Sequence, residues 1–184
     1  AKRVAVGLGI DFQVFDFQKE YKQKVVDYMI REYQAGRTPN PDVMCNQEVK
    51  FKLFLEAALA AGAEYIATGH YARTFSPAGP VARSASENFS GELKTFSGAT
   101  RRADSCLSEG RLFRAHDDNK DQTYFLYRVT SGALAKTMFP LGDFTKAEVR
   151  QMAKERGLWT ASKKESMGIC FVGQVGIREF LSEY

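Results

Sequence analysis

Two cysteines, Cys45 and Cys170, lie in segments whose residue types are typical of chemical sites. Cys45 follows a stretch with two prolines, a glycine and several Asx residues, which predicts that a rigid loop presents its thiol. Asn46 is then expected to cap a helix that begins at the next residue. A thiol at a helix N-terminus feels the positive end of the helix dipole, and Lys50 and Lys52 add positive charge. Both effects should lower its pKa toward that of a reactive thiolate.

Each cysteine also has a purely structural interpretation, because a cysteine without a reactive role is most often a small buried apolar residue. Cys170 lies between Ile169 and Phe171, which is equally typical of a core strand. The third cysteine, Cys106, falls in a polar segment and is interpreted as an incidental exposed thiol. Three widely spaced cysteines do not make a secreted disulfide framework, so a reducing compartment fits the chain better.

The first half of the chain predicts the elements that must position Cys45. Apolar runs and alternation indicate strands, and three-to-four spacing of apolar residues indicates helices, which end at Gly36 and Gly62. The order strand, helix, helix, strand predicts an α/β fold with an open, mostly parallel sheet and flanking helices. The predicted strands are residues 2–6, 12–17 and 65–71, and the predicted helices are residues 18–35 and 47–61.

The second half predicts a strand at 111–115, a helix at 123–129 and a further helix at 145–156. The last helix has a capping-box pattern at its start and a glycine just beyond its end. Residues between these halves are polar and small, which is typical of a surface insertion. We therefore divide the chain into 1–73 and 111–172 as parts of one catalytic domain, 74–110 as the insertion, and 173–184 as the start of a following domain.

Bulk composition narrows the class of protein. With 184 residues, 44% hydrophobic and 26% charged, the chain can build one full core. Its apolar runs are too short for a membrane span, so no membrane partner is expected. A net charge of +4 permits an anionic partner such as RNA. His70 and His116 do not share zinc-ligand spacing with the cysteines, so we predict no bound metal and no organic prosthetic group.

Several runs taken together resemble the tRNA-specific 2-thiouridylases, a family within the PP-loop ATP pyrophosphatase superfamily. The resemblance covers nearly all of the chain outside the insertion. It implies a Rossmann-like fold of the adenine-nucleotide alpha-hydrolase type. The runs that carry it are residues 35–42, 45–46, 50–52, 67–71, 119–122, 124–126, 139–142, 163–166 and 168–171.

The resemblance also implies a reaction. ATP, with Mg²⁺, would adenylate the C2 oxygen of the wobble uridine of a tRNA, so that AMP becomes the leaving group. A persulfide on one cysteine, loaded by a sulfur donor protein, would then deliver sulfur to give 2-thiouridine. A second cysteine would complete the transfer, and the two cysteines could close as a disulfide.

The resemblance assigns roles to particular residues. Cys45 is similar to the family's nucleophile and Cys170 to its persulfide-bearing cysteine. The run Asn40, Pro41 and Asp42 is similar to the one that contacts the target base. Asp42, three residues before Cys45, could bind a flipped base or move a proton.

Two further runs are assigned in the same way. Lys120, Asp121 and Gln122 are similar to a tRNA-contacting run, and a lysine there could contact phosphate. Without the resemblance, this run is better interpreted as a solvated helix start with Asp121 near the dipole. Gly69 is similar to a nucleotide-contacting glycine at the end of a strand, where open α/β sheets bind nucleotides. The adjacent His70 is interpreted as a hydrogen-bonded structural residue.

The chain departs from the family at its start. The family's first strand leads into a Ser-Gly-Gly-x-Asp-Ser pyrophosphate-binding loop, whereas here Gly7, in the position of the last residue before that loop, is followed at once by Leu8-Gly9-Ile10-Asp11. One glycine and no serine do not make a phosphate loop, but Gly7, like Gly69, is expected to lie beside a bound nucleotide. The chain is therefore interpreted as a catalytic-domain fragment with an internal deletion that removes the PP-loop.

Three functions stay open on this basis. The first is an ATP-dependent tRNA 2-thiouridylase. The second is an inactive tRNA-binding remnant that cannot activate uridine. The third is a thiol-disulfide or sulfur-relay protein that uses Cys45 and Cys170 without nucleic acid. The compartment expected is the cytoplasm for a bacterial protein and the mitochondrion for a eukaryotic one.

Overall fold

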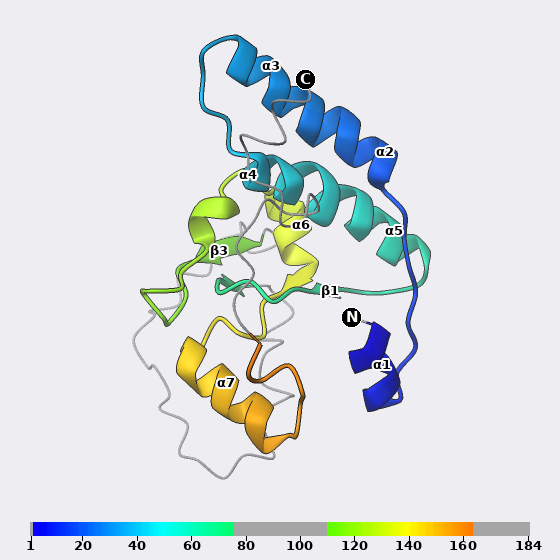
Figure 1. The fold of residues 1–184 in the computed structure, drawn as a ribbon, viewed down its shortest axis with the longest axis vertical. Coiled ribbons are helices and arrows are strands. Elements are labelled where there is room, and N and C mark those ends of the chain that lie inside the picture. The colour runs from blue at the N-terminus through cyan, green and yellow to red at the C-terminus, as the bar shows by residue number, and fades with distance from the viewer. Residues whose placement is uncertain (1, 76–109, 164–184) are drawn as a thin grey trace, which may run out of the picture.

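A computed structural model describes residues 2–75 and 110–163, and the following statements concern those residues. Its main body is a layer of helices lying over short strands, with two outlying helices, α1 and α7 (Figure 1). None of the described helices combines the length and apolar character needed to cross a membrane. Residues 76–109, which make up most of the predicted insertion 74–110, lie outside the described part, as do Cys106, Cys170 and residues 173–184. Residues 74 and 75, placed in the insertion by the prediction, belong to a strand instead.

Two long helices form the helical layer, and together we call them the helix pair. The first runs through α2 (Gln18–Tyr21), a π-helical stretch η1 (Lys22–Val26) and α3 (Asp27–Gln34). The second runs through α4 (Pro41–Cys45), a π-helical stretch η2 (Asn46–Phe54) and α5 (Leu55–Ala60). Gly36 and Gly62 follow them with φ of 72° and 94°, left-handed values that suit glycine. The predicted ends of both helices are thus confirmed.

The start of the second helix was predicted wrongly. It begins at Pro41 rather than near Gln47, and Asn40 is its N-cap, whose Oδ1 accepts bonds from the backbone N–H groups of Asp42 and Val43 at 3.1 and 3.2 Å. Proline is well suited to the first helical position, because the N–H that it lacks would have no partner there. The proline that suggested a loop therefore marks the first turn of the helix.

The strands are short and pair in two ways. β1 (Ile66–Ala67) pairs in parallel with β4 (Thr137–Met138), whereas β2 (Arg73–Phe75) pairs antiparallel with β3 (Arg111–Phe113). The predicted strands around 65–71 and 111–115 are confirmed in shorter form, and β4 was not predicted. The α/β character is confirmed. The described strands form two two-stranded sheets, one parallel and one antiparallel, instead of the predicted single, mostly parallel sheet.

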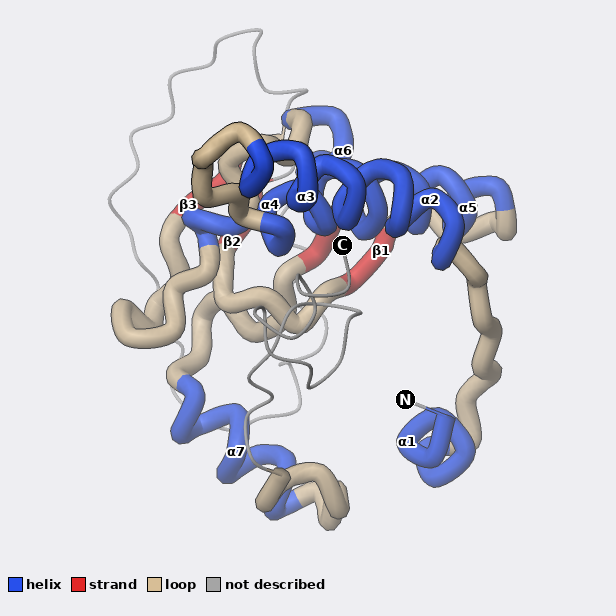
Figure 2. The backbone as a smooth tube through the Cα atoms, turned by 45° about the horizontal axis from the view of Figure 1, so that its top comes forward, coloured by secondary structure: helices blue, strands red, loops and turns tan. Residues whose placement is uncertain are grey.

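The main core lies between the second helix and the strands (Figure 2). The short helix α6 (Ser131–Ala135), also not predicted, leads into β4 and contributes to this core. Gly142 packs so closely on the backbone of Ala72 that a side chain would not fit there. The buried members of the core are Phe51, Leu55, Ala58, Ile66, Ala72, Leu126, Ala133, Leu134 and Phe139.

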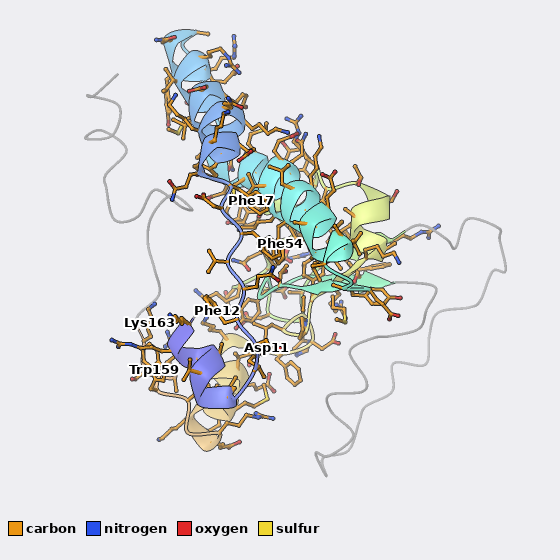
Figure 3. All side chains as sticks on the ribbon, turned by 90° about the vertical axis from the view of Figure 1, so that its right-hand side faces the viewer. Asp11, Phe12, Phe17, Phe54, Trp159 and Lys163 are labelled. Atoms are coloured by element: carbon orange, nitrogen blue, oxygen red, sulfur yellow. The ribbon has the colours of Figure 1, made fainter. Side chains whose placement is uncertain are left out.

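Residues 2–17 differ from the prediction of two strands. Residues 2–8 form a helix, α1 (Lys2–Leu8), and residues 10–17 are extended but pair with no described strand. A strand needs a neighbour to take its backbone hydrogen bonds, whereas a helix satisfies its own, so a lone strand-forming sequence has no advantage here. The extended segment touches the helix pair through Phe15, whose ring meets that of Phe54 edge-on with centroids 5.9 Å apart. Figure 3 shows this crossing near Phe17 and Phe54.

The last described elements agree better with the sequence. A short 3₁₀ helix, η4 (Thr123–Phe125), stands where a longer helix was predicted. α7 (Lys146–Glu155) has the predicted capping box between Thr145 and Glu148, and Gly157 follows it with φ of 63°. These signals are local, which is why they could be recognised from the sequence alone.

Candidate functional site

The first turn of α4 holds the run predicted to contact a target base. The Asn40 side chain is used to cap the helix, so its oxygen faces the backbone of its own turn. Asp42 lies in that first turn, where the helix dipole favours a carboxylate. Pro41 and Asp42 are half-buried, and Asn40 is exposed. The run is therefore held rigidly at a helix N-terminus, with one carboxylate at the edge of the surface.

Cys45 is placed differently from the prediction. It is the last residue of α4, inside the helix, and its side chain is completely buried (0% exposed). It packs in a cluster between the two helices of the helix pair. The loop presentation of the thiol and the cap at Asn46 are therefore both wrong, because the helix already begins at Pro41. The other buried members of this cluster are Tyr21, Val25, Val26 and Val49.

The two lysines expected to activate this thiol have other neighbours. The ammonium group of Lys52 lies 3.4 Å from Glu48 Oε2, and that of Lys24, on the first helix, lies 3.2 Å from the same oxygen. Burial acts to raise the pKa of Glu48, but its bonds and attraction to these two lysines hold it below the ordinary value. Lys50 acts on His70, whose pKa it helps to lower. The ion pair between Lys24 and Glu48 thus links the two helices.

Asn46 links the start of the second helix to a distant turn. Its side chain is 2% exposed, and its Nδ2 donates to the carbonyl of Phe125 in η4 at 3.1 Å. Its Oδ1 and the Oε1 of the next residue, Gln47, are buried without a hydrogen-bond partner among the described residues. The bond from Nδ2 holds the start of η2 against η4. The oxygen without a partner costs folding free energy, because it has lost its bonds to water.

Asp121 organises the turn that leads into η4, residues 115–123, which we call the polar turn. Its Oδ1 accepts from the backbone N–H of Ala115 at 3.0 Å, and its Oδ2 accepts from the Thr123 hydroxyl at 2.8 Å and from Arg114 Nε at 3.3 Å. Burial acts to raise the pKa of Asp121, but these bonds outweigh it and hold the pKa below 3.8. The carboxylate is thus used to shape the turn.

Gln122 connects the polar turn to the end of β1. Its Oε1 accepts from the backbone N–H of Tyr71 at 3.0 Å, and its own N–H donates to the Tyr71 carbonyl at 2.9 Å. Lys120 is half-buried, and its N–H donates to the carbonyl of Asp117 at 3.0 Å. Two of the three residues predicted to contact tRNA therefore have side chains bonded within the fold, and neither is a freely solvated residue at a helix start.

The residues that follow β1 form the third predicted run. Gly69 is exposed at the carboxyl end of β1, and a Cβ there would meet only the end of Leu141 at 3.9 Å. No steric conflict within the fold requires a glycine here, so an open backbone at this strand end is available to a ligand.

His70 next to it is structural, as predicted. Its Nδ1 lies 2.9 Å from the Thr68 hydroxyl, and its ring packs against Phe51 and Phe139 with centroids 5.8 and 6.2 Å away. Burial, with a smaller contribution from Lys50, lowers the pKa of His70 from 6.5 to about 4. The imidazole is therefore neutral at pH 7.

Two side-chain contacts bring the three runs into one region. Asn46 joins the helix of Cys45 to η4, and Gln122 joins the polar turn to Tyr71 beyond β1. Both contacts span long stretches of sequence, and neither was predicted. Gln122 lies between two polar residues and Asn46 between Cys45 and Gln47, so no local pattern signals these contacts.

Gly7 is not part of this region. It lies exposed in α1 rather than at a strand end, and Figure 1 shows α1 apart from the helix pair and the polar turn. Gly9, with φ of 65°, ends α1: its N–H donates to the Val6 carbonyl at 3.2 Å, and that of Ile10 donates to Ala5 at 3.1 Å. This is a helix C-cap, so these backbone N–H groups are used within the turn. Within residues 2–75 and 110–163, no three His, Cys, Asp or Glu side chains gather as a metal site.

Comparisons with known proteins identify the family of the chain. Residues 1–174 match the family model described as the tRNA methyl transferase HUP domain. Proteins named tRNA-specific 2-thiouridylase MnmA from Bacillus thuringiensis (strain Al Hakam), Bacillus cereus (strain Q1) and Bacillus anthracis are each 48% identical over 177 residues. The match covers 96% of this chain and 40% of each relative, so the chain spans about two fifths of their length. The chain belongs to the family of the tRNA methyl transferase HUP domain, whose members have a Rossmann-like α/β fold.

Proposed function

We propose that this chain is the catalytic segment of a tRNA 2-thiouridylase, which converts the wobble uridine of a tRNA to 2-thiouridine. The observation that carries this proposal is the 48% identity, over 96% of the chain, to proteins named for that activity. The geometry supports it, because the runs around Cys45, Gln122 and Gly69 meet in one region through the bonds of Asn46 and Gln122.

Uridine is activated first. The C2 oxygen attacks the α-phosphorus of ATP, pyrophosphate leaves, and the oxygen becomes part of an AMP leaving group. Mg²⁺ would travel with the ATP phosphates. Of the described residues, Gly69 is the one that we place next to the nucleotide, because it lies open at the carboxyl end of a parallel strand. Asp42, at the N-terminal turn of α4, would hold the N3–H of the flipped base.

Sulfur transfer follows. The terminal sulfur of a Cys170 persulfide, loaded by a donor protein, attacks C2, and AMP leaves with the original oxygen. The Cys45 thiolate then attacks the Cys170 sulfur, so that the S–S bond to the base-bound sulfur breaks. One disulfide forms between the two cysteines, and the 2-thiouridine is released. A reductant must reopen the disulfide before the next cycle.

The burial of Cys45 sets a condition on this step. Because the thiol is completely enclosed between the helices, they must separate before Cys45 can react. Both helices carry a π-helical stretch at this contact, η1 opposite the thiol and η2 directly after it. Such wider turns are often found at functional sites, where they allow a helix to shift. We therefore expect η1 and η2 to be where the helix pair opens.

A second candidate function is RNA binding without activation of uridine. The observation that favours it is the local structure of residues 2–10, where Gly9, the glycine that follows Leu8, ends α1 with its N–H bonded to Val6. A sulfur relay without nucleic acid is less well supported, because the relatives that are 48% identical are named for an activity on tRNA.

Two half-reactions separate these candidates. ATP with Mg²⁺ is first titrated calorimetrically into the folded chain, and pyrophosphate release is then measured with and without tRNA. Thiolated tRNA is detected by its retardation in a mercury-containing gel. The proposal expects the Cys170→Ser variant to lose thiolation and to keep tRNA-dependent pyrophosphate release. Binding of tRNA without ATP binding would favour the second candidate. Thiolation by the Cys170→Ser variant would contradict the assigned roles.

A further inference from the structure

α7 stands out because it is tethered to the fold and yet barely covered by it. None of its ten residues is fully buried. It is held at its N-terminus, where the N–H of Lys146 donates to Asp117 Oδ2 at 2.8 Å, and the capping box closes the same end. Figure 1 shows it projecting away from the helix pair. A rigid, well-capped helix with open faces is a suitable platform for a partner.

One face of α7 and the turn that follows it enclose an open hollow of about 580 Å³. Its polar lining comes from Arg150, Gln151 and Lys154 on the helix and from Ser162 in the turn. Trp159 forms an aromatic wall, and none of the described residues that line the hollow is acidic. The volume falls in the range of pockets that hold small ligands or single groups of larger ones.

Trp159 is held outward by an ordered turn. The left-handed Gly157 reverses the chain, and the N–H of Leu158 reaches back to the carbonyl of Ala153 at 2.9 Å. The N–H of Ala161 then donates to Leu158 at 2.9 Å. Within this turn the Trp159 side chain is 60% exposed. Figure 3 shows Trp159 and Lys163 at the end of the molecule remote from the helix pair.

The charge around the hollow favours an anionic partner. Residues 145–163 contain five basic and two acidic side chains. Both acids have bonds within α7: Glu148 Oε2 accepts from the Thr145 N–H at 2.6 Å, and Glu155 Oε1 accepts from Gln151 Nε2 at 2.8 Å. Basic side chains thus outnumber acidic ones by three in this segment. Two of them, Arg150 and Lys154, lie one helical turn apart on the face that carries the hollow.

We propose that this face is an RNA-binding subsite, in which an unpaired base stacks on Trp159 while Arg150 and Lys154 contact the flanking phosphates. An exposed aromatic ring beside regularly spaced cations is the combination that binds single-stranded nucleic acid. The subsite rests on the proposed function only in taking tRNA as the natural partner. It would bind an unpaired region of the tRNA away from the target uridine.

Trp159 is the only tryptophan of the chain, so its fluorescence reports directly on the subsite. The probe is an RNA hairpin with an unpaired loop, added to the full chain. We expect quenching that saturates with binding, and no comparable quenching by ATP or by polyglutamate at equal charge. ATP as effective as RNA would indicate a free-nucleotide site, and polyglutamate as effective as RNA would indicate an acidic protein partner. Either result would overturn the proposal.

Variants are compared by the anisotropy of labelled RNA. Trp159→Ala should weaken binding roughly 10- to 100-fold, and Trp159→Phe should recover part of the loss. Arg150→Ala with Lys154→Ala should lower the salt slope of log K by roughly 1.4, the loss of two phosphate contacts. Lys19→Ala with Arg31→Ala, an equal charge change on the exposed side of the first helix, is the control and should leave binding nearly unchanged.

The outcomes separate this inference from the proposed function. RNA binding by the wild-type chain, with unaltered Trp159 fluorescence and an unaffected Trp159→Ala variant, would overturn the subsite and leave tRNA thiolation standing. A folded wild-type chain that binds no RNA would overturn both. Equal losses in the two double variants would show a general charge effect and would also overturn the subsite.

Discussion

The helix pair and the polar turn carry two of the predicted functional runs, and they are built in opposite ways. Cys45 lies in an apolar interface, enclosed by Val25, Val26 and Val49. The polar turn is ordered by the side chains of Asp121 and Gln122, which accept hydrogen bonds from backbone N–H groups. The Asn46 side chain, bonded to Phe125, joins the second helix to η4, which directly follows the polar turn.

The difference suggests a division of labour. An apolar interface keeps the thiol away from water and oxidants until the helices separate, and it can re-form without leaving polar groups unpaired. A hydrogen-bonded turn keeps its shape at the surface, as the RNA contact that we predict for this run would require. The predictions below therefore separate packing from chemistry in the helix pair, and hydrogen bonding from charge in the polar turn.

The largest effect is expected from Cys45→Ala, compared with Val49→Ala in the same cluster. The cysteine variant should lose tRNA thiolation by at least ~10³-fold, because the nucleophile is gone. Its unfolding free energy should fall by only about 1 kcal/mol. Val49→Ala should lose about 1–3 kcal/mol and keep thiolation at temperatures where it is folded. Urea unfolding and the mercury-gel assay measure the two quantities, and an active Cys45→Ala variant would remove this thiol from the mechanism.

Asp121→Asn tests the polar turn. We expect a loss of about 1–3 kcal/mol at pH 7, because a charged acceptor of several bonds is replaced by a poorer one. The folded pKa of Asp121 lies below 3.8, so its contribution is present above about pH 4 and is lost as the pH falls through the folded value. The gap between wild type and variant should therefore narrow below pH 4. A gap that stays constant from pH 7 to pH 3 would show that the charge of Asp121 does not matter.

These two regions also show what could be predicted from the sequence. Helix ends at Gly36, Gly62 and Gly157 were predicted correctly, because each depends on local backbone conformation. Asn40-Pro41 was interpreted as a loop although Asn followed by Pro is also a common helix start, so that signal was available and was missed.

Other features depend on contacts that no local pattern reveals. β4 is two residues long, too short for a recognisable alternation. Residues 2–6 have a strand-like composition, but a strand requires a partner that the described chain does not supply. The bonds between Asn46 and Phe125 and between Gln122 and Tyr71 join residues far apart in sequence. The burial of Cys45 follows from the packing of two helices, so it could not be predicted without knowing which faces of the two helices meet.

Asn46→Ala tests the link between the regions, and Gln47→Ala is its control. Removing the Nδ2 donor leaves the Phe125 carbonyl without this bond, so we expect a loss of about 1 kcal/mol in unfolding free energy. The loss should be accompanied by faster hydrogen exchange in η4. The Gln47 side chain bonds to Glu48 and not to η4, so Gln47→Ala should leave hydrogen exchange in η4 unchanged. Equal exchange in both variants would mean that Asn46 does not connect the two regions.

The smallest effect at neutral pH is expected for His70. Its pKa is lowered to about 4 by burial, so the folded state holds the neutral ring while the unfolded state gains a proton below about 6.5. Stability should thus be unaffected above pH 7 and should fall as the pH drops from 6.5 toward 4. His70→Gln should flatten that decline, and NMR titration of the His70 ring should give the low pKa directly. A ring that titrates near 6.5 would contradict its burial between Phe51 and Phe139.

The most direct test of the account is to map the cysteines after a single turnover. The chain, with Cys170 loaded as a persulfide, is mixed with tRNA, ATP and Mg²⁺, quenched with an alkylating reagent and digested for mass spectrometry. The account predicts one peptide pair joined by a Cys45–Cys170 disulfide for each 2-thiouridine formed, and none when ATP or tRNA is omitted. Formation of 2-thiouridine while Cys45 stays reduced, or formation of the disulfide without ATP and tRNA, would contradict it.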